Sequence, residues 1–76
     1  MPAKLISDTG EALYGAEWRP QLARALDVAS VTMQQWISGE IVPPDNVMTA
    51  LLRLTQERIR VLIDLEARIL ARQDET

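Results

Sequence analysis

The sequence contains neither cysteine nor histidine among its 76 residues. The absence of cysteine excludes disulfide bonds, and the absence of both residue types excludes the usual zinc sites, so we expect no metal and no cofactor. Nothing resembles a signal peptide, and the apolar runs are much shorter than the roughly 18 residues of a membrane-spanning helix. We therefore expect a cytoplasmic protein that does not associate with membranes.

Positive charge is also scarce, because 8 Lys and Arg face 11 Asp and Glu, for a net charge of −3. This balance argues against a protein that coats nucleic acid or membranes through bulk charge, although it leaves room for a small local basic surface. At this length the chain forms one domain whose core only marginally offsets the entropy lost on folding. Stability must therefore come from packed apolar surface or from assembly with another chain.

Short helical patterns separated by turn signals occupy residues 1–43. Residues 1–7 have no clear period, so we expect a loose lead-in whose Leu5 and Ile6 dock on the core. Asp8 and Glu11 fit a capping box, which predicts a first helix from Thr9 to Tyr14 that ends at Gly15.

Two further short helices are predicted on either side of Asp27, a residue type that tolerates the left-handed backbone of a sharp turn. The first begins near Arg19, with Pro20 in its first turn. The second spans about residues 29–38, with its start at Ala29 or Ser30 left open, and ends at Gly39. The residues expected to face the core are Tyr14, Trp18, Leu22, Ala23, Leu26, Val28, Met33, Trp36 and Ile37.

The longest predicted element is a helix over residues 44–72, because no glycine or proline follows Pro44; residues 73–76 would be a tail. Its apolar side chains form two adjacent stripes that span roughly 200°, about twice what one packed face needs. The first stripe is Val47, Leu51, Leu54, Val61, Leu62, Leu65 and Ile69; the second is Leu52, Ile59, Ile63 and Leu70. A second copy of the helix is the simplest cover for this surplus, in a parallel or an antiparallel arrangement.

We therefore predict a homodimer, with an interface formed by Leu54, Arg58, Val61, Leu62, Leu65 and Ile69. Arg58 lies within the apolar stripe and has two interpretations. It extends to the edge of the stripe, or it pairs with Glu66 or Asp64 of the partner subunit. The opposite face carries a solvated ladder of charges: Arg53, Glu57, Arg60, Asp64 and Arg68.

Residues 19–39, RPQLARALDVASVTMQQWISG, carry the pattern of a helix-turn-helix. Ala23 is the small residue where the two helices cross, Asp27 takes the turn, and apolar residues on both sides fix the angle. The stretch resembles the Cro/repressor-type helix-turn-helix family. The wider run, ALYGAEW through GEIVPPDNV, is similar to small phage or mobile-element regulators such as anti-CRISPR-associated repressors. The chain has Asp27 where this family usually has glycine.

The resemblance implies an all-α, four-helix, lambda-repressor-like helix-turn-helix domain with a long C-terminal dimerisation helix. It places the helix over about residues 29–38 in the major groove of double-stranded DNA. The residues implied to contact bases are Ala29, Ser30, Val31, Gln34, Gln35 and Ser38. The residues assigned to phosphates are Arg19 and Arg24. Residues 18–39 sum to only +1 per chain, so few phosphates would be neutralised and base contacts would supply most of the specificity.

The leading functional prediction is a homodimeric repressor, acting on its own operon as the resemblance implies, which binds a palindrome with half-sites about 34 Å apart. The alternative is a protein-interaction module such as an antitoxin or adaptor, which the acidic balance, Glu40 and the uncharged helix over residues 30–38 favour. We expect no enzymatic activity and no small-molecule ligand, because the carboxylates fall on caps, turns and a solvent face, and neither a nucleophile motif nor a phosphate-binding loop is present.

Overall fold

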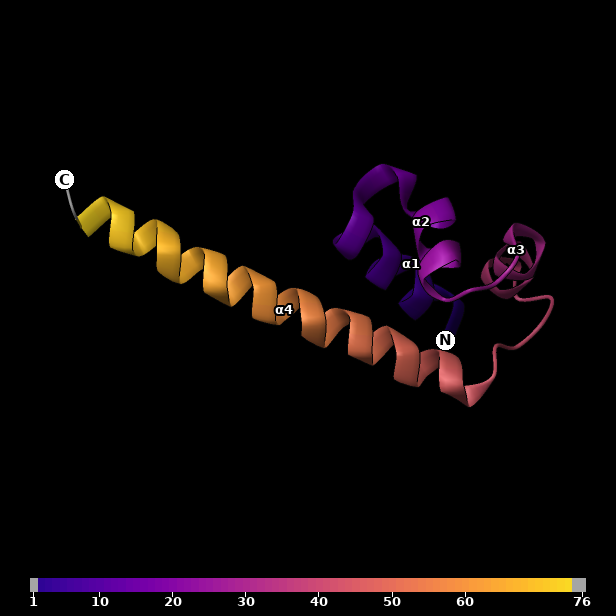
Figure 1. The fold of residues 1–76 in the computed structure, drawn as a ribbon. Coiled ribbons are helices and arrows are strands. Elements are labelled where there is room, and N and C mark those ends of the chain that lie inside the picture. Colours follow the sequence, from indigo (N-terminus) through magenta and orange to yellow (C-terminus); the bar gives the residue numbers. More distant parts are fainter. Residues whose placement is uncertain (1, 75–76) are drawn as a thin grey trace.

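The computed structural model describes residues 2–74, which form four α-helices and a short 3-10 helix, η1. These elements are α1 (Pro2–Tyr14), η1 (Gly15–Glu17), α2 (Trp18–Ala25), α3 (Ser30–Ser38) and α4 (Asp45–Asp74). α1, α2 and α3 gather around the N-terminal part of α4, and the rest of α4 projects away from them (Figure 1). The predicted all-α class and long C-terminal helix are confirmed. Residues 73–74 extend α4 rather than form a tail, and residues 75–76 lie outside the described part of the chain.

The prediction of a loose lead-in is wrong, because α1 already begins at Pro2; Met1 lies outside the described residues. Proline suits the first position of a helix, where its ring presets the backbone and its missing N–H removes no helical hydrogen bond. Ile6 is fully buried, and α1 contacts α2, α3 and α4. Burial of this side chain at the centre of the domain explains why the segment is helical.

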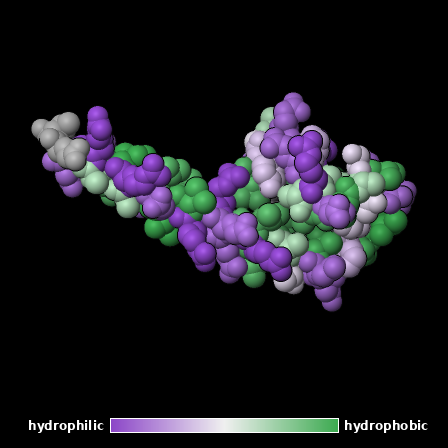
Figure 2. All heavy atoms as spheres, viewed as in Figure 1, coloured by the Kyte–Doolittle hydropathy of each residue, from purple (hydrophilic) through white to green (hydrophobic). Residues whose placement is uncertain are grey.

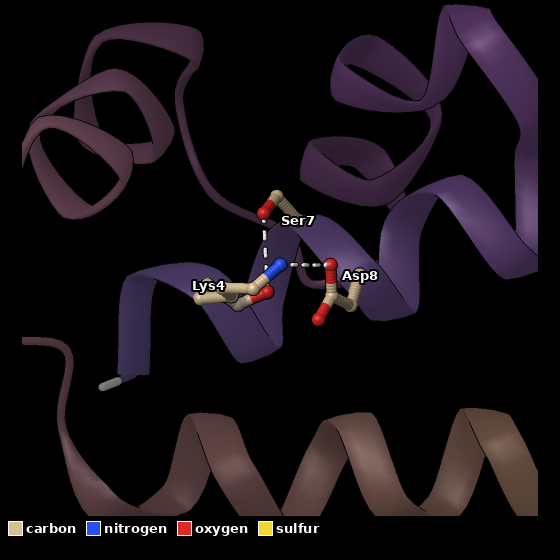
Figure 3. Close-up of polar contacts among 3 residues, drawn as sticks. All are labelled: Lys4, Ser7 and Asp8. Atoms are coloured by element: carbon tan, nitrogen blue, oxygen red, sulfur yellow. Dashed lines mark hydrogen bonds and ion pairs between the residues drawn. The ribbon is translucent and has the colours of Figure 1, made fainter.

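Asp8 consequently lies in the middle of α1 and does not cap its start. Its carboxylate accepts a hydrogen bond from Lys4 Nζ at 3.2 Å, and Ser7 Oγ donates to the Lys4 carbonyl at 3.1 Å (Figure 3). Both contacts are exposed, and an exposed i, i+4 ion pair contributes only tenths of a kcal/mol. The helical turn before Asp8 buries Ile6. This burial outweighs the capping-box signal, so the helix begins earlier than that signal predicts.

Gly10 is buried inside α1 because the indole of Trp18 packs directly on its backbone. A Cβ at Gly10 would overlap Trp18 Cε3 and lie 2.7 Å from Trp18 Cδ2. Glycine inside a helix costs roughly 1 kcal/mol relative to alanine, and at this position it permits the close approach of the ring. α1 ends before Gly15, at φ 80, as the sequence predicts.

The turn between α2 and α3 has the hydrogen bonds of a Schellman motif. Asp27 has φ 57, its N–H donates to the Arg24 carbonyl at 3.1 Å, and Val28 N–H donates to the Ala23 carbonyl at 2.9 Å. These two bonds satisfy carbonyls at the end of α2 that would otherwise lack partners. The predicted left-handed residue at Asp27 is confirmed.

The core draws on all four α-helices. Its fully or nearly buried hydrophobic residues are Ile6, Trp18, Leu22, Ala23, Met33, Trp36, Val47 and Leu51. Tyr14, Leu26, Val28 and Ile37 pack on it half-buried. The predicted inward residues of α2 and α3 are thus confirmed, with Val28 less buried than expected. α3 begins at Ser30, with Ala29 in an extended conformation before it, and Gly39 ends it at φ 84.

α4 is too long for the domain that it supports. Its 30 residues correspond to about 45 Å, and the molecule measures 54 × 22 × 21 Å with a radius of gyration of 15.5 Å. A compact chain of this length would have a radius of gyration of about 11 Å. Every residue from Ile59 to Asp74 is exposed, so the second half of α4 receives no cover from the described part of its own chain.

Arg58 joins the base of this projection to α1. Its Nη1 donates to the Leu13 carbonyl at 2.9 Å, and its guanidinium lies 5.9 Å from the centre of the Tyr14 ring. A cation at the C-terminal end of α1 is favoured by the helix dipole. Neither interpretation of Arg58 predicted this contact, in which the side chain binds α1 of its own chain.

Candidate nucleic-acid interface

α3 separates its apolar and polar side chains onto different faces. Met33 and Trp36 are buried in the core, whereas Ser30, Val31, Gln34 and Ser38 are exposed. These four residues, which we call the α3 outer face, occupy adjacent positions around the helix because residues three, four and seven apart share a side. α3 lies at the end of the molecule remote from the C-terminus (Figure 1). Its outer face is therefore not covered by α4.

The residues predicted to contact bases do not all lie on this face. Ala29 precedes α3 and is exposed. Gln35 is half-buried at the edge of the face, and its carbonyl accepts hydrogen bonds from Ser38 Oγ and Ile41 N–H, both at 3.2 Å. Ser38 Oγ also accepts from Glu40 N–H at 3.4 Å. Ser38 therefore helps to close the end of α3, and Gln34 is the exposed glutamine at the centre of the face.

Arg19 lies beside the N-terminal end of α3. A shallow hollow of about 140 Å³ is lined by Arg19, Pro20, Ser30, Met33 and Gln34. The Arg19 guanidinium sits 5.1 Å from the centre of the Trp18 ring, and this cation–π contact restricts where the exposed side chain points. The structure thus brings a predicted phosphate ligand next to two predicted base ligands. Arg24 is exposed in the last turn of α2, outside this hollow.

The surroundings of α3 combine acidic and apolar groups. Glu40 and Asp45 are exposed on the segment that follows it. Ile41 and Val42 in the same loop are 45% and 77% exposed, and Val31 on α3 is 63% exposed. Two arginines, Arg19 and Arg24, thus precede α3 in the sequence, and two carboxylates follow it. Any polyanion bound here would depend on local contacts more than on a broad basic field.

Two residues of the predicted dimer surface pack against their own domain. Leu54 and Arg58 are half-buried against their own domain, whereas the later members of the stripe, Val61, Leu62, Leu65 and Ile69, are exposed. The projecting part of α4 shows apolar side chains interspersed with charged ones (Figure 2). On its charged side, Arg68 Nη1 pairs with Asp64 Oδ2 at 3.3 Å, as the predicted ladder requires.

The sequence reasoning missed a groove between α1 and α4. One hollow of about 290 Å³ is lined by Leu5, Thr9, Met48, Leu51, Leu52 and Thr55. A second, of about 230 Å³, is lined by Asp8, Thr9, Ala12, Leu13 and Thr55. They share Thr9 and Thr55 and are therefore adjacent; together we call them the α1–α4 groove. If residues 2–7 had been predicted as a helix, Leu5 and Thr9 would have fallen on one face of it, because they are four residues apart. That shared face is the sequence signal that could have revealed the groove.

Neither a family model, nor a curated protein, nor a solved structure matches this chain. In residues 2–74 no helix is long and apolar enough to cross a membrane. A proposal for the function therefore rests on the geometry of α2, the turn and α3.

Proposed function

We propose that the chain is a sequence-specific DNA-binding transcriptional regulator that acts as a cytoplasmic homodimeric repressor, with α2 and α3 as a lambda-repressor-like helix-turn-helix. The observation that carries this proposal is the α3 outer face, an exposed and uncharged set of hydrogen-bonding and methyl groups on a short helix. Its angle to α2 is fixed by a hydrogen-bonded turn. A helix presented in this way fits the major groove of B-DNA.

The chemistry of the α3 outer face suits the reading of bases. The Gln34 amide can both accept from and donate to the edge of adenine, Ser30 can donate or accept, and the Val31 methyls can contact the thymine methyl. Ala29 supplies only a methyl group at the start of α3. The first amides of α3 therefore remain available to a phosphate oxygen, beside Arg19 in the same hollow. Autorepression of a phage or mobile-element operon follows from the sequence resemblance alone.

Replacement of Gln34 by alanine tests the base-reading role. We expect operator affinity to fall about tenfold or more, since a bidentate base contact is worth roughly 1–3 kcal/mol, with little change in melting temperature because Gln34 is exposed. The Gln35→Ala variant is expected to weaken binding less, because Gln35 is half-buried. The measurement is a fluorescence anisotropy titration on a duplex obtained by selection from random sequences. Thr49→Ala, on the exposed side of α4, is the control. Wild-type affinity of both glutamine variants would disprove the assigned base contacts.

Replacement of Arg19 by alanine tests the phosphate contact. We expect weaker binding to every duplex, specific or random. We also expect the slope of log K against log [salt] to fall by about 0.9 for each lost phosphate contact. Arg68→Ala removes the same charge from the projecting half of α4 and should leave the slope unchanged. A loss confined to the operator sequence would contradict the phosphate role and point to base reading by Arg19.

A second function is supported by the exposed Ile41 and Val42 and by the neighbouring Glu40 and Asp45. Exposed apolar side chains with polar residues at their edge are typical of a surface that binds protein, as in an antitoxin or adaptor. Retention on random-sequence DNA at low salt distinguishes the two functions. A DNA-binding regulator is retained and elutes with salt, whereas a protein-interaction module passes through and is captured by a protein partner.

A further inference from the structure

The second apolar stripe of α4 is exposed along its whole length. Leu52, Ile59, Ile63 and Leu70 are 57%, 50%, 60% and 54% exposed, and we call them the free stripe. Their spacings of seven, four and seven residues match the a and d positions of a heptad repeat, with Gln56 and Glu66 at the two intervening positions. The first stripe packs on the core through Val47, Leu51 and Leu54, whereas no member of the free stripe is buried. It is therefore the surface that a second α4 can cover over several heptads.

The free stripe is complementary to itself when the second helix runs in the opposite direction. When the two-fold axis lies level with Val61 along the helix, between the Ile59 and Ile63 layers, Leu52 lies opposite the partner's Leu70, and Ile59 lies opposite the partner's Ile63. The Val61 side chain itself points away from this seam. The two polar positions also match, since Gln56 faces the partner's Glu66. An amide can donate a hydrogen bond to a carboxylate, so every layer of this antiparallel pair has a compatible neighbour.

A parallel pair has no such match at Glu66. Residues of equal number then face each other, so Glu66 would lie against the partner's Glu66 in the middle of an apolar seam. Two carboxylates brought together and removed from water repel each other and lose hydration. Charge complementarity therefore favours the antiparallel arrangement.

The α1–α4 groove provides independent support. In the antiparallel register the partner's Ile69 and Leu70 come level with residues 53 and 52, where the groove is lined by Leu5, Met48 and Leu52. Leu5 is 53% exposed and lies across this groove from α4. In this arrangement the C-terminal half of the partner's α4 lies over the α1–α4 groove. The exposed apolar surface of the groove and that of the partner helix are then buried together.

We propose that two copies of this chain pair through the free stripes of antiparallel α4 helices, with the two-fold axis between the Ile59 and Ile63 layers, and that the C-terminal half of each α4 fills the α1–α4 groove of its partner. This inference deepens the homodimer of the proposed function and is independent of DNA. The predicted interface is revised accordingly. Leu62 and Ile69 remain at the interface beside the free stripe. Leu54 and Arg58 serve their own domain, and Val61 and Leu65 lie on the side of α4 that faces away from the seam.

The arrangement also fixes how far apart the two domains lie. Sixteen residues separate Asp45 from Val61, so the N-terminal ends of the two α4 helices are about 48 Å apart at 1.5 Å per residue. This exceeds the roughly 34 Å between successive major grooves on one face of DNA. We therefore expect operator half-sites that are spaced more widely than one helical turn.

Cross-linking between introduced cysteines tests the register, because the native chain has no cysteine. Leu52→Cys and Leu70→Cys are prepared separately, checked for helicity, and treated with a short bis-maleimide either alone or after refolding as a mixture. In the proposed dimer residue 52 is about 27 Å from its own counterpart and adjacent to the partner's residue 70. We expect cross-linked dimer in the mixture and little with either variant alone.

Glu57→Cys, on the opposite face of α4, is the control, and its mixture with Leu70→Cys should give no cross-link. Efficient cross-linking of Leu52→Cys alone would show a parallel pair and overturn the proposal. A monomer by light scattering at micromolar concentration, with no cross-link in the mixture, would also overturn it. Failure to bind DNA with the expected cross-links intact would refute the proposed function and leave this arrangement standing.

Discussion

Replacement of Gly10 by alanine is expected to destabilise the protein, although alanine is the better helix former by roughly 1 kcal/mol. The added methyl would overlap the indole of Trp18, which is buried and held between α1 and α2. Overpacking of this kind typically costs about 1–3 kcal/mol, a large share of the stability of so small a domain. Urea unfolding monitored by circular dichroism, at one fixed chain concentration, measures the loss.

A double-mutant cycle isolates the contact with Trp18. Trp18→Leu removes the ring and is destabilising by itself, but in that background Gly10→Ala should be neutral or stabilising. The change of sign is the diagnostic result. If Gly10→Ala destabilises equally in both backgrounds, the overlap with the indole is not the cause, and the close packing of α1 against Trp18 is disproved.

Replacement of Trp36 by alanine is expected to have the largest effect on stability. Trp36 is only 5% exposed and, with Met33, anchors α3 to the core. Removal of a large buried aromatic side chain typically costs about 3–5 kcal/mol, which approaches the whole stability of a domain of this size. We expect a drop in melting temperature large enough to leave the variant partly unfolded at 37 °C, together with loss of DNA binding.

The comparison with Gln34→Ala makes this prediction specific to the core. Gln34 and Trp36 are two residues apart on α3 but lie on opposite faces, so one variant should lose binding with its stability intact and the other should lose both. Trp36→Phe, which keeps an aromatic ring in the core, should recover most of the stability. A Trp36→Ala variant as stable as the wild type would show that α3 is not held by this side chain.

The functional proposals depend differently on these helices. DNA reading requires that α3 stay fixed to α2 by the turn at Asp27 and by Trp36, whereas dimerisation requires only α4 and the groove beside α1. A variant can therefore lose one property without the other. Because the proposed dimer would set the spacing of the two α3 helices, half-site spacing measured by selection from random duplexes would report on the register of α4 as well as on DNA binding. A spacing of about 10 base pairs would contradict the antiparallel pairing.

Local patterns were enough to predict the turn, the helix end and the core positions that hold α3 in place. The stop at Gly39, the left-handed turn at Asp27 and the inward positions of Met33 and Trp36 all depend on neighbours within about one helical turn. Such features can be recognised without knowledge of the rest of the fold. The different environments of Gln34 and Gln35 were not distinguished, because a residue at the edge of a helix face is buried or exposed according to what packs beside it.

The sequence by itself determined that the protein is all-helical, that a turn divides α2 from α3 at Asp27, and that α4 carries more apolar surface than its own domain can cover. Only the tertiary structure decided that residues 2–7 belong to α1, that Arg58 contacts the C-terminal end of α1, and which apolar residues of α4 pack on the core. The reason is physical. Turns and helix periodicity depend on interactions between residues close in the chain, whereas the burial of Ile6, Gly10 or Leu52 depends on groups that are distant in sequence and adjacent only after folding.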